Sequence, residues 1–71
     1  MKKFIAVIGL YDEVTTEQIA LKEIIVTATD IYQAHKEALY KCNLQENQLV
    51  LRLYYTDNRR LGFDFQKGFL P

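Results

Sequence analysis

The chain contains one histidine and one cysteine, His35 and Cys42, the two side chains best suited to nucleophilic catalysis or metal binding. They are seven positions apart in a segment expected to be helical. A helix places them on one face but about 10 Å apart along its axis. That separation is too large for a thiolate–imidazole pair. Too few other soft ligands accompany them to form a metal site, so both side chains are expected to pack against an apolar surface.

Other patterns that carry catalysis are equally weak in this sequence. Asp12 and Glu13 are adjacent in a polar segment and are expected to be solvated rather than to act as a general acid–base pair. Gly9, Gly62 and Gly68 are isolated and do not form a phosphate-binding loop. The chain has no serine, which excludes a serine nucleophile. We therefore expect no catalytic residue, no cofactor and no metal, and a protein that is not an enzyme.

A further set of residues combines positive charge with aromatic rings. Its members are Arg52, Tyr54, Arg59, Arg60, Lys67 and Phe69. Arginine and tyrosine on an open sheet face can bind single-stranded nucleic acid, because bases stack on the rings and phosphates pair with the guanidinium groups. Glu23 and Asp64 are expected on the same face and dilute the charge. The nine basic and nine acidic residues give a net charge of zero, which lacks the positive field typical of nucleic-acid binders. Nucleic-acid binding through Arg52, Tyr54 and Arg60 is the alternative hypothesis.

Length and composition predict one small globular domain covering residues 1–71. A lone Cys42 cannot form an internal disulfide, which favours a reducing, cytoplasmic location. Lys2 and Lys3 precede an apolar run that resembles the start of a signal peptide, but the run is short and no small-x-small cleavage site follows. No segment is long enough to cross a bilayer, so no membrane association is expected.

The central feature of the expected fold is a strand that leads directly into a helix. Ile24, Ile25, Val26 and Thr27 are β-branched and favour a strand. A helix is the alternative for this region, because Leu21, Ile24, Ile25 and Ala28 have helical spacing and Thr15 and Gln18 have the spacing of a capping box. The density of β-branched residues decides for the strand.

The helix is expected to begin after Asp30, which can act as N-cap with Gln33 completing a capping box. Asn43 is the expected stop, since asparagine tolerates a left-handed conformation. Helical periodicity gathers six residues on the inner face: Ile31, Ala34, His35, Ala38, Leu39 and Cys42. The two alanines allow this helix to approach a sheet closely.

Three more strands are expected. They run from Lys3 to Leu10, from Leu49 to Tyr55 and from Leu61 to Phe65. The first is an almost continuous apolar run, and the other two alternate in polarity. Asp57 and Asn58 predict a tight turn between the last two strands. Residues 11–18 are expected to form a loop, 44–47 a connection and 67–71 a C-terminal tail.

These elements predict an α+β fold in which a four-stranded antiparallel sheet carries the helix on one face. The preferred strand order is 2-1-3-4, because it places the two most apolar strands at the centre. The helix is expected to cover Phe4, Ala6, Ile8, Ile24, Val26, Leu49, Leu51, Leu53, Leu61, Phe63 and Phe65. The opposite face is expected to carry Lys3, Glu23, Arg52, Arg60 and Asp64 together with Ile5, Val7, Ile25, Val50 and Tyr54.

Apolar residues on the face opposite the helix indicate that something covers it, since monomers rarely leave such a patch in water. The first hypothesis is therefore a non-enzymatic protein-interaction module that forms a homodimer or binds another protein. The predicted partner-binding residues are Ile5, Val7, Ile25, Val50, Arg52 and Tyr54. The C-terminal tail, through Phe69 and Leu70, is the expected cover if the chain is monomeric. Zero net charge also weakens repulsion between copies of the chain.

Overall fold

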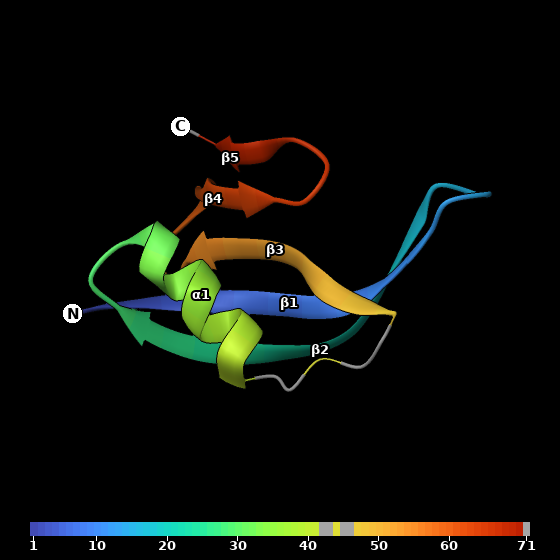
Figure 1. Cartoon of the computed structure of the whole chain (residues 1–71). Coiled ribbons are helices and arrows are strands. Elements are labelled where there is room, and N and C mark those ends of the chain that lie inside the picture. Colours follow the sequence, from blue (N-terminus) through green and yellow to red (C-terminus); the bar gives the residue numbers. More distant parts are fainter. Residues whose placement is uncertain (42–43, 45–46, 71) are drawn as a thin grey trace.

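The computed structural model describes residues 1–41, 44 and 47–70 and has an α+β fold, with a helix packed on one face of an antiparallel sheet (Figure 1). The elements are β1 (Lys2–Asp12), β2 (Glu17–Ala28), α1 (Ile31–Lys41), β3 (Gln48–Tyr55), β4 (Asn58–Asp64) and β5 (Gly68–Leu70). The sheet order is β2-β1-β3-β4-β5. The predicted order of the first four strands is confirmed, and part of the expected tail adds β5 beside β4.

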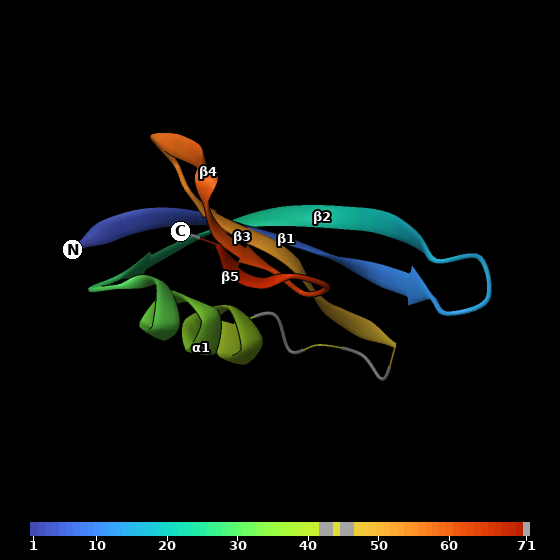
Figure 2. The same ribbon diagram turned by 90° about the horizontal axis from the view of Figure 1, so that it is seen from above.

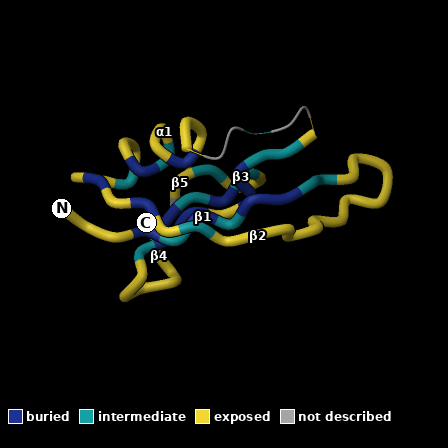
Figure 3. Tube along the Cα trace, turned by 90° about the horizontal axis from the view of Figure 1, so that it is seen from below, coloured by how far each residue is buried: buried dark blue, intermediate teal, exposed yellow. Residues whose placement is uncertain are grey.

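The first hairpin is longer than predicted. The expected loop at 11–18 is wrong, because β1 continues to Asp12 and β2 begins at Glu17. The turn between them is tight: one carboxylate oxygen of Asp12 accepts hydrogen bonds from the backbone amides of Val14 at 2.8 Å and Thr15 at 3.3 Å. The strand interpretation of residues 24–28 is confirmed over the helical one. The far end of this hairpin extends beyond the helix and is exposed (Figure 3).

Helix α1 begins as predicted. The Asp30 carboxylate accepts a hydrogen bond of 2.9 Å from the backbone amide of Gln33, which is the expected N-cap contact. Ala34 and Ala38 are fully buried against the sheet. Leu39, predicted on the inner face, is 46% exposed because it lies at the flank of the helix. The predicted positions of Cys42 and Asn43 lie outside the described residues.

The two sides of the sheet differ in what stands on them. Figure 2 shows α1 on one side and the tip of the β3–β4 hairpin rising on the other. Tyr55 pairs with Asn58, so the tight turn is at Thr56 and Asp57. The predicted turn at Asp57 and Asn58 is therefore wrong by one residue. This hairpin projects from the face that the helix leaves uncovered.

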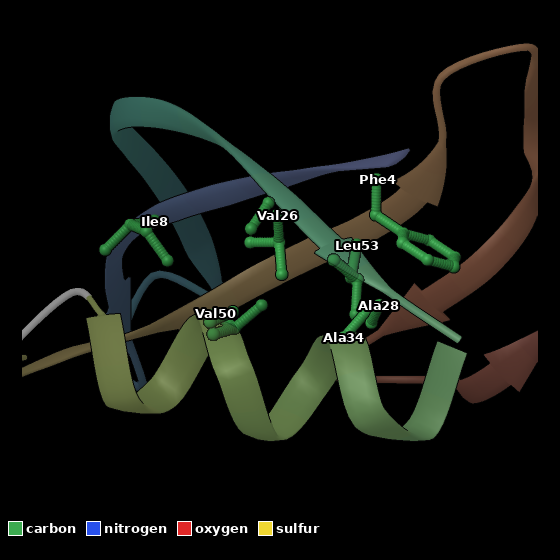
Figure 4. Packing of buried hydrophobic residues seen from close by; sticks show 9 residues of the cluster. Phe4, Ile8, Val26, Ala28, Ala34, Val50 and Leu53 are labelled. Atoms are coloured by element: carbon green, nitrogen blue, oxygen red, sulfur yellow. The ribbon is translucent and has the colours of Figure 1, made fainter. Parts of the chain in front are cut away.

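The core lies between α1 and the sheet (Figure 4). Phe4, Ala6, Ile8, Val26 and Leu53 are completely buried there, as predicted. The cluster also contains Ala28, Ala34, Ala38 and Val50. Ile24 and Phe63 are partly buried against it, in agreement with the prediction. Leu49, Leu61 and Phe65 were expected under the helix as well and lie outside this cluster.

A β-bulge in β3 explains why Val50 and Leu51 were assigned to the wrong faces. Val7 pairs with Arg52, but Ile8 pairs with Val50, which leaves Leu51 as an extra residue. The side chain of Val50 therefore points toward α1, where it is 3% exposed. The predicted placement of Val50 on the face opposite the helix is wrong. Strict alternation fails here because one inserted residue reverses the direction of every side chain before it.

Four rings form a cluster where α1 meets β4 and β5. The His35 ring lies 4.4 Å from that of Phe63, and Phe69 lies 4.6 Å from Tyr32 and 5.0 Å from Phe63, measured between ring centroids. His35 thus packs as expected. Phe69 docks on the helix side of the sheet, so its side chain does not cover the opposite face. Leu70 belongs to β5 through its backbone pairing with Gly62.

Burial among these rings lowers the pKa of His35 below its ordinary value of about 6.5. In the pH interval between the lowered pKa and about 6.5 the unfolded chain binds a proton that the folded chain does not. The free energy of unfolding should therefore decrease as the pH falls from 7.5 through this interval. Urea unfolding at several pH values should show this loss in the wild type and a flatter profile in His35→Phe.

The carboxylates do not confuse this measurement, because the pKa values of Asp12 and Asp64 are lowered from 3.8 and their effects come at more acidic pH. An unchanged slope in His35→Phe between pH 7.5 and 5 would contradict the role given to His35.

Candidate functional site

The open face is defined here as the side of the sheet opposite α1. The pairings that place residues on it are Ile5 with Ile25 and Tyr54, Val7 with Glu23 and Arg52, and Arg52 with Asp64. Opposite residues in an antiparallel pair point to the same side of the sheet. The structure therefore brings together five of the six predicted partner-binding residues, Ile5, Val7, Ile25, Arg52 and Tyr54, and excludes Val50.

These five side chains differ greatly in accessibility. Ile25 is 57% exposed, and Ile5 and Val7 are half-buried. Tyr54 is only 8% exposed, although the sequence placed it at the centre of the contact surface. The reachable apolar surface of the open face thus lies on β1 and β2, and it is greatest at Ile25.

Tyr54 is covered by the β3–β4 hairpin. The guanidinium carbon of Arg59 lies 5.2 Å from the centroid of the Tyr54 ring, within the range of a cation–π contact. A shallow groove runs beside this pair, with Val7, Leu51 and Tyr54 among its apolar lining and Glu23, Arg52 and Arg59 among its charged lining. Arg60 borders a neighbouring hollow together with Arg52 and Tyr54. A base that stacked on Tyr54 would have to displace Arg59.

Asp64 is the buried charged residue of the open face, with 4% exposure. Its carboxylate accepts hydrogen bonds from the backbone amides of Gln66 at 2.9 Å and Lys67 at 3.3 Å, and the Nε of Arg52 lies 3.4 Å away. Burial acts to raise the pKa of Asp64, but these donors outweigh burial and hold the pKa below 3.8. The Asp64 carboxylate fixes the turn between β4 and β5 through these backbone hydrogen bonds.

One end of the open face is closed by contacts between segments far apart in the chain. We call this set the Gln18–Gln66 bridge; it consists of Tyr11, Gln18, Phe65 and Gln66. The Gln18 amide donates to Gln66 at 2.8 Å, the Gln66 amide donates to the Tyr11 hydroxyl at 3.3 Å, and the Tyr11 and Phe65 rings meet edge to face at 4.7 Å. The bridge and the β3–β4 hairpin therefore bracket the exposed patch of Ile5, Val7 and Ile25.

Within residues 1–41, 44 and 47–70, no group of three His, Cys, Asp or Glu side chains could hold a metal ion. His35 lies in the ring cluster on the helix side, away from the open face. In the same described part of the chain, no helix is long and apolar enough to cross a membrane.

Comparisons with known proteins give no further guide to function. No family model, curated protein or solved structure matches this chain.

The sequence did not indicate three features that shape the open face: the placement of Leu51 on this face, the packing of Arg59 on Tyr54 and the Gln18–Gln66 bridge. Leu51 takes its position from the bulge, and Gly9 makes room for it, because a Cβ at Gly9 would lie 2.7 Å from a Leu51 methyl group. The two hydrogen bonds of the bridge join residues that are 48 and 55 positions apart in the sequence. Local patterning contains no signal for such pairs.

The two partners of the Arg52–Asp64 pair should contribute very differently to stability. Asp64→Ala leaves the Gln66 amide without its acceptor, whereas the Lys67 amide keeps its hydrogen bond to the Asp64 backbone carbonyl, and the substitution should cost about 2 kcal/mol. Arg52→Ala removes only a side chain that is 59% exposed, so its cost should stay below about 1 kcal/mol. Urea unfolding of both variants tests this. Equal losses would show that the ion pair, rather than the turn, carries the stabilisation.

Proposed function

We propose that this protein is a small non-enzymatic interaction module that self-associates through the open face of its sheet. The observation that supports the proposal is Ile25, 57% exposed beside half-buried Ile5 and Val7 on a face without helix cover. Exposed apolar clusters of this kind mark protein contacts. The non-enzymatic part of the proposal rests on the sequence, which has no serine and places its single histidine and cysteine too far apart for a nucleophilic pair.

The setting proposed for this module is the cytoplasm, because Cys42 is the single cysteine of the chain. Association between identical copies meets no long-range repulsion, since the net charge is zero. The apolar patch of this face consists of Ile5, Val7 and Ile25, and Ile25 is its most exposed member. Tyr54 packs against Arg59 and so holds the β3–β4 hairpin that borders this patch. Arg52 lies at the rim of the patch.

Static light scattering combined with size-exclusion chromatography across a dilution series tests the proposal. The wild type should show a mass that falls from dimer toward monomer on dilution. Ile25→Lys should raise the dissociation constant at least about tenfold, because an ammonium group would be desolvated in the contact. The fold should tolerate this change, since the side chain is largely exposed.

Val14→Lys is the matched control. Val14 is 92% exposed at the turn of the first hairpin, so the same change of charge there should leave the association unaffected. A wild type that stays monomeric at all concentrations, or equal effects of the two lysines, would refute the proposal.

Nucleic-acid binding is the second candidate. It is favoured by the placement of Arg52, Arg59 and Arg60 around one hollow with Tyr54. Binding of a mixed-sequence single-stranded oligonucleotide, measured by fluorescence anisotropy at low salt, should then weaken steeply with added salt and drop in Arg52→Glu. No binding at low ionic strength would remove this candidate.

A further inference from the structure

Strand β2 lies at the edge of the sheet, and its apolar residue on the open face is more exposed than those of β1. Among the described strands it pairs with β1 alone, over the whole length Glu17–Ala28. Its backbone groups on the other side can pair with a further strand. Ile25 lies on this strand, which explains why it is the most exposed member of the open-face patch.

The first half of the β2 edge is protected against pairing. This part of the strand, from Glu17 to Glu23, carries the charges of Glu17, Lys22 and Glu23, and its register with β1 shifts between Ala20 and Lys22. Charged residues and bulges are the usual means of keeping an edge strand from pairing with another chain. The protection ends at Glu23.

The second half of the edge has none of these features. Residues 24–28 read Ile-Ile-Val-Thr-Ala, with no charge, proline or glycine, and they pair with β1 in unbroken register. β-branched residues without charge form the most favourable strand partners. The opposite edge of the sheet is formed by β5, which is three residues long. Residues 24–28 are therefore the segment of the sheet edge best suited to accept a strand.

The geometry points to a second copy of this chain as the occupant: segment 24–28 pairs antiparallel with segment 24–28 of an identical molecule, with Ile25 on the two-fold axis. This inference rests on the proposed self-association and places its contact at the β2 border of the open face, where Ile25 lies, so that the two sheets join edge to edge and the open faces of both copies form one surface. The β3–β4 hairpin and the Gln18–Gln66 bridge border the open-face patch and leave Ile25 exposed on the β2 side. The β3–β4 hairpin lies on the far side of β1 from the β2 edge (Figure 1).

The charges of β2 select the register. In a two-fold antiparallel pair one residue lies opposite its own copy, and residues equally spaced on either side of it face each other. Centring on Lys22 or Glu23 would oppose like charges, and centring on Ile24 would place Glu23 against Ile25. Centring on Val26 would place Ile25 against Thr27.

With Ile25 at the axis these conflicts disappear. Ile25 then faces Ile25 of the second copy on the open-face side, and Ile24 faces Val26 on the helix side. Glu23 faces Thr27, whose hydroxyl can donate to the carboxylate. β-branched pairs and hydrogen-bonded pairs of this kind stabilise adjacent strands. The contact is short, so the association should be weak and reversed by dilution.

Cysteine cross-linking tests the register in a Cys42→Ala background, which removes the native thiol. Ile25→Cys should form a disulfide-linked dimer under mild oxidation, because cross-strand Cα atoms at the axis lie about 5 Å apart. Thr27→Cys is the matched control: its two copies would be about 13 Å apart along the strands, beyond the reach of a disulfide. A mixture of Glu23→Cys and Thr27→Cys should give the heterodimeric cross-link.

Hydrogen–deuterium exchange on the unmodified chain provides a second readout. Amides within 24–28 should exchange more slowly in concentrated than in dilute samples, while those of 17–21 should not change. If light scattering shows a dimer but Val7→Cys cross-links and Ile25→Cys does not, the edge pairing is overturned and the proposed self-association stands. If the wild type is monomeric at every concentration, both are overturned.

Discussion

The fold depends on the pairing of β1 with a neighbour on each side. Its side chains alternate between the helix face, where Phe4, Ala6 and Ile8 are completely buried, and the open face, where Ile5 and Val7 are half-buried. Because β1 is hydrogen-bonded to both β2 and β3, their side chains can take only the faces that its alternation allows. Helix α1 then has one place to bury Ala34 and Ala38, across the three strands that carry the core.

The same constraint divides the molecule into a closed side and a partly closed one. On the helix side the packing is continuous, and the ring cluster around His35 extends it to β5. On the open side, the β3–β4 hairpin covers Tyr54 through Arg59, and the Gln18–Gln66 bridge closes the opposite end. Because of the bulge, Leu51 lines the groove between them. The bulge, the hairpin and the bridge thus bury part of the open face, and its residues become more exposed toward β2.

The distribution of exposed apolar surface carries the functional argument. Ile25 stands where the open face meets an edge strand, so the same residue belongs to a side-chain patch and to a row of backbone groups able to pair. The exposure of Ile25 and the balanced charge of the chain are the observations on which the proposed role in recognition rests. The exposed apolar side chain and the edge position together single out residues 24–28 of β2, which neither would do alone.

The amino-acid sequence by itself determined the strand–helix unit capped by Asp30, the strand order and most of the core, because β-branched density, capping and alternation are local properties. It did not determine the length of the first hairpin, the direction of Val50 and Leu51, or the burial of Tyr54. These depend on one inserted residue in a strand register and on contacts between distant segments, which only the tertiary structure decides. The predicted set of open-face residues is therefore right for most positions, but Val50 lies on the other face and Tyr54 is buried. The exposed apolar surface of the open face lies at the edge, on Ile25, because the centre is where the folded chain covers itself.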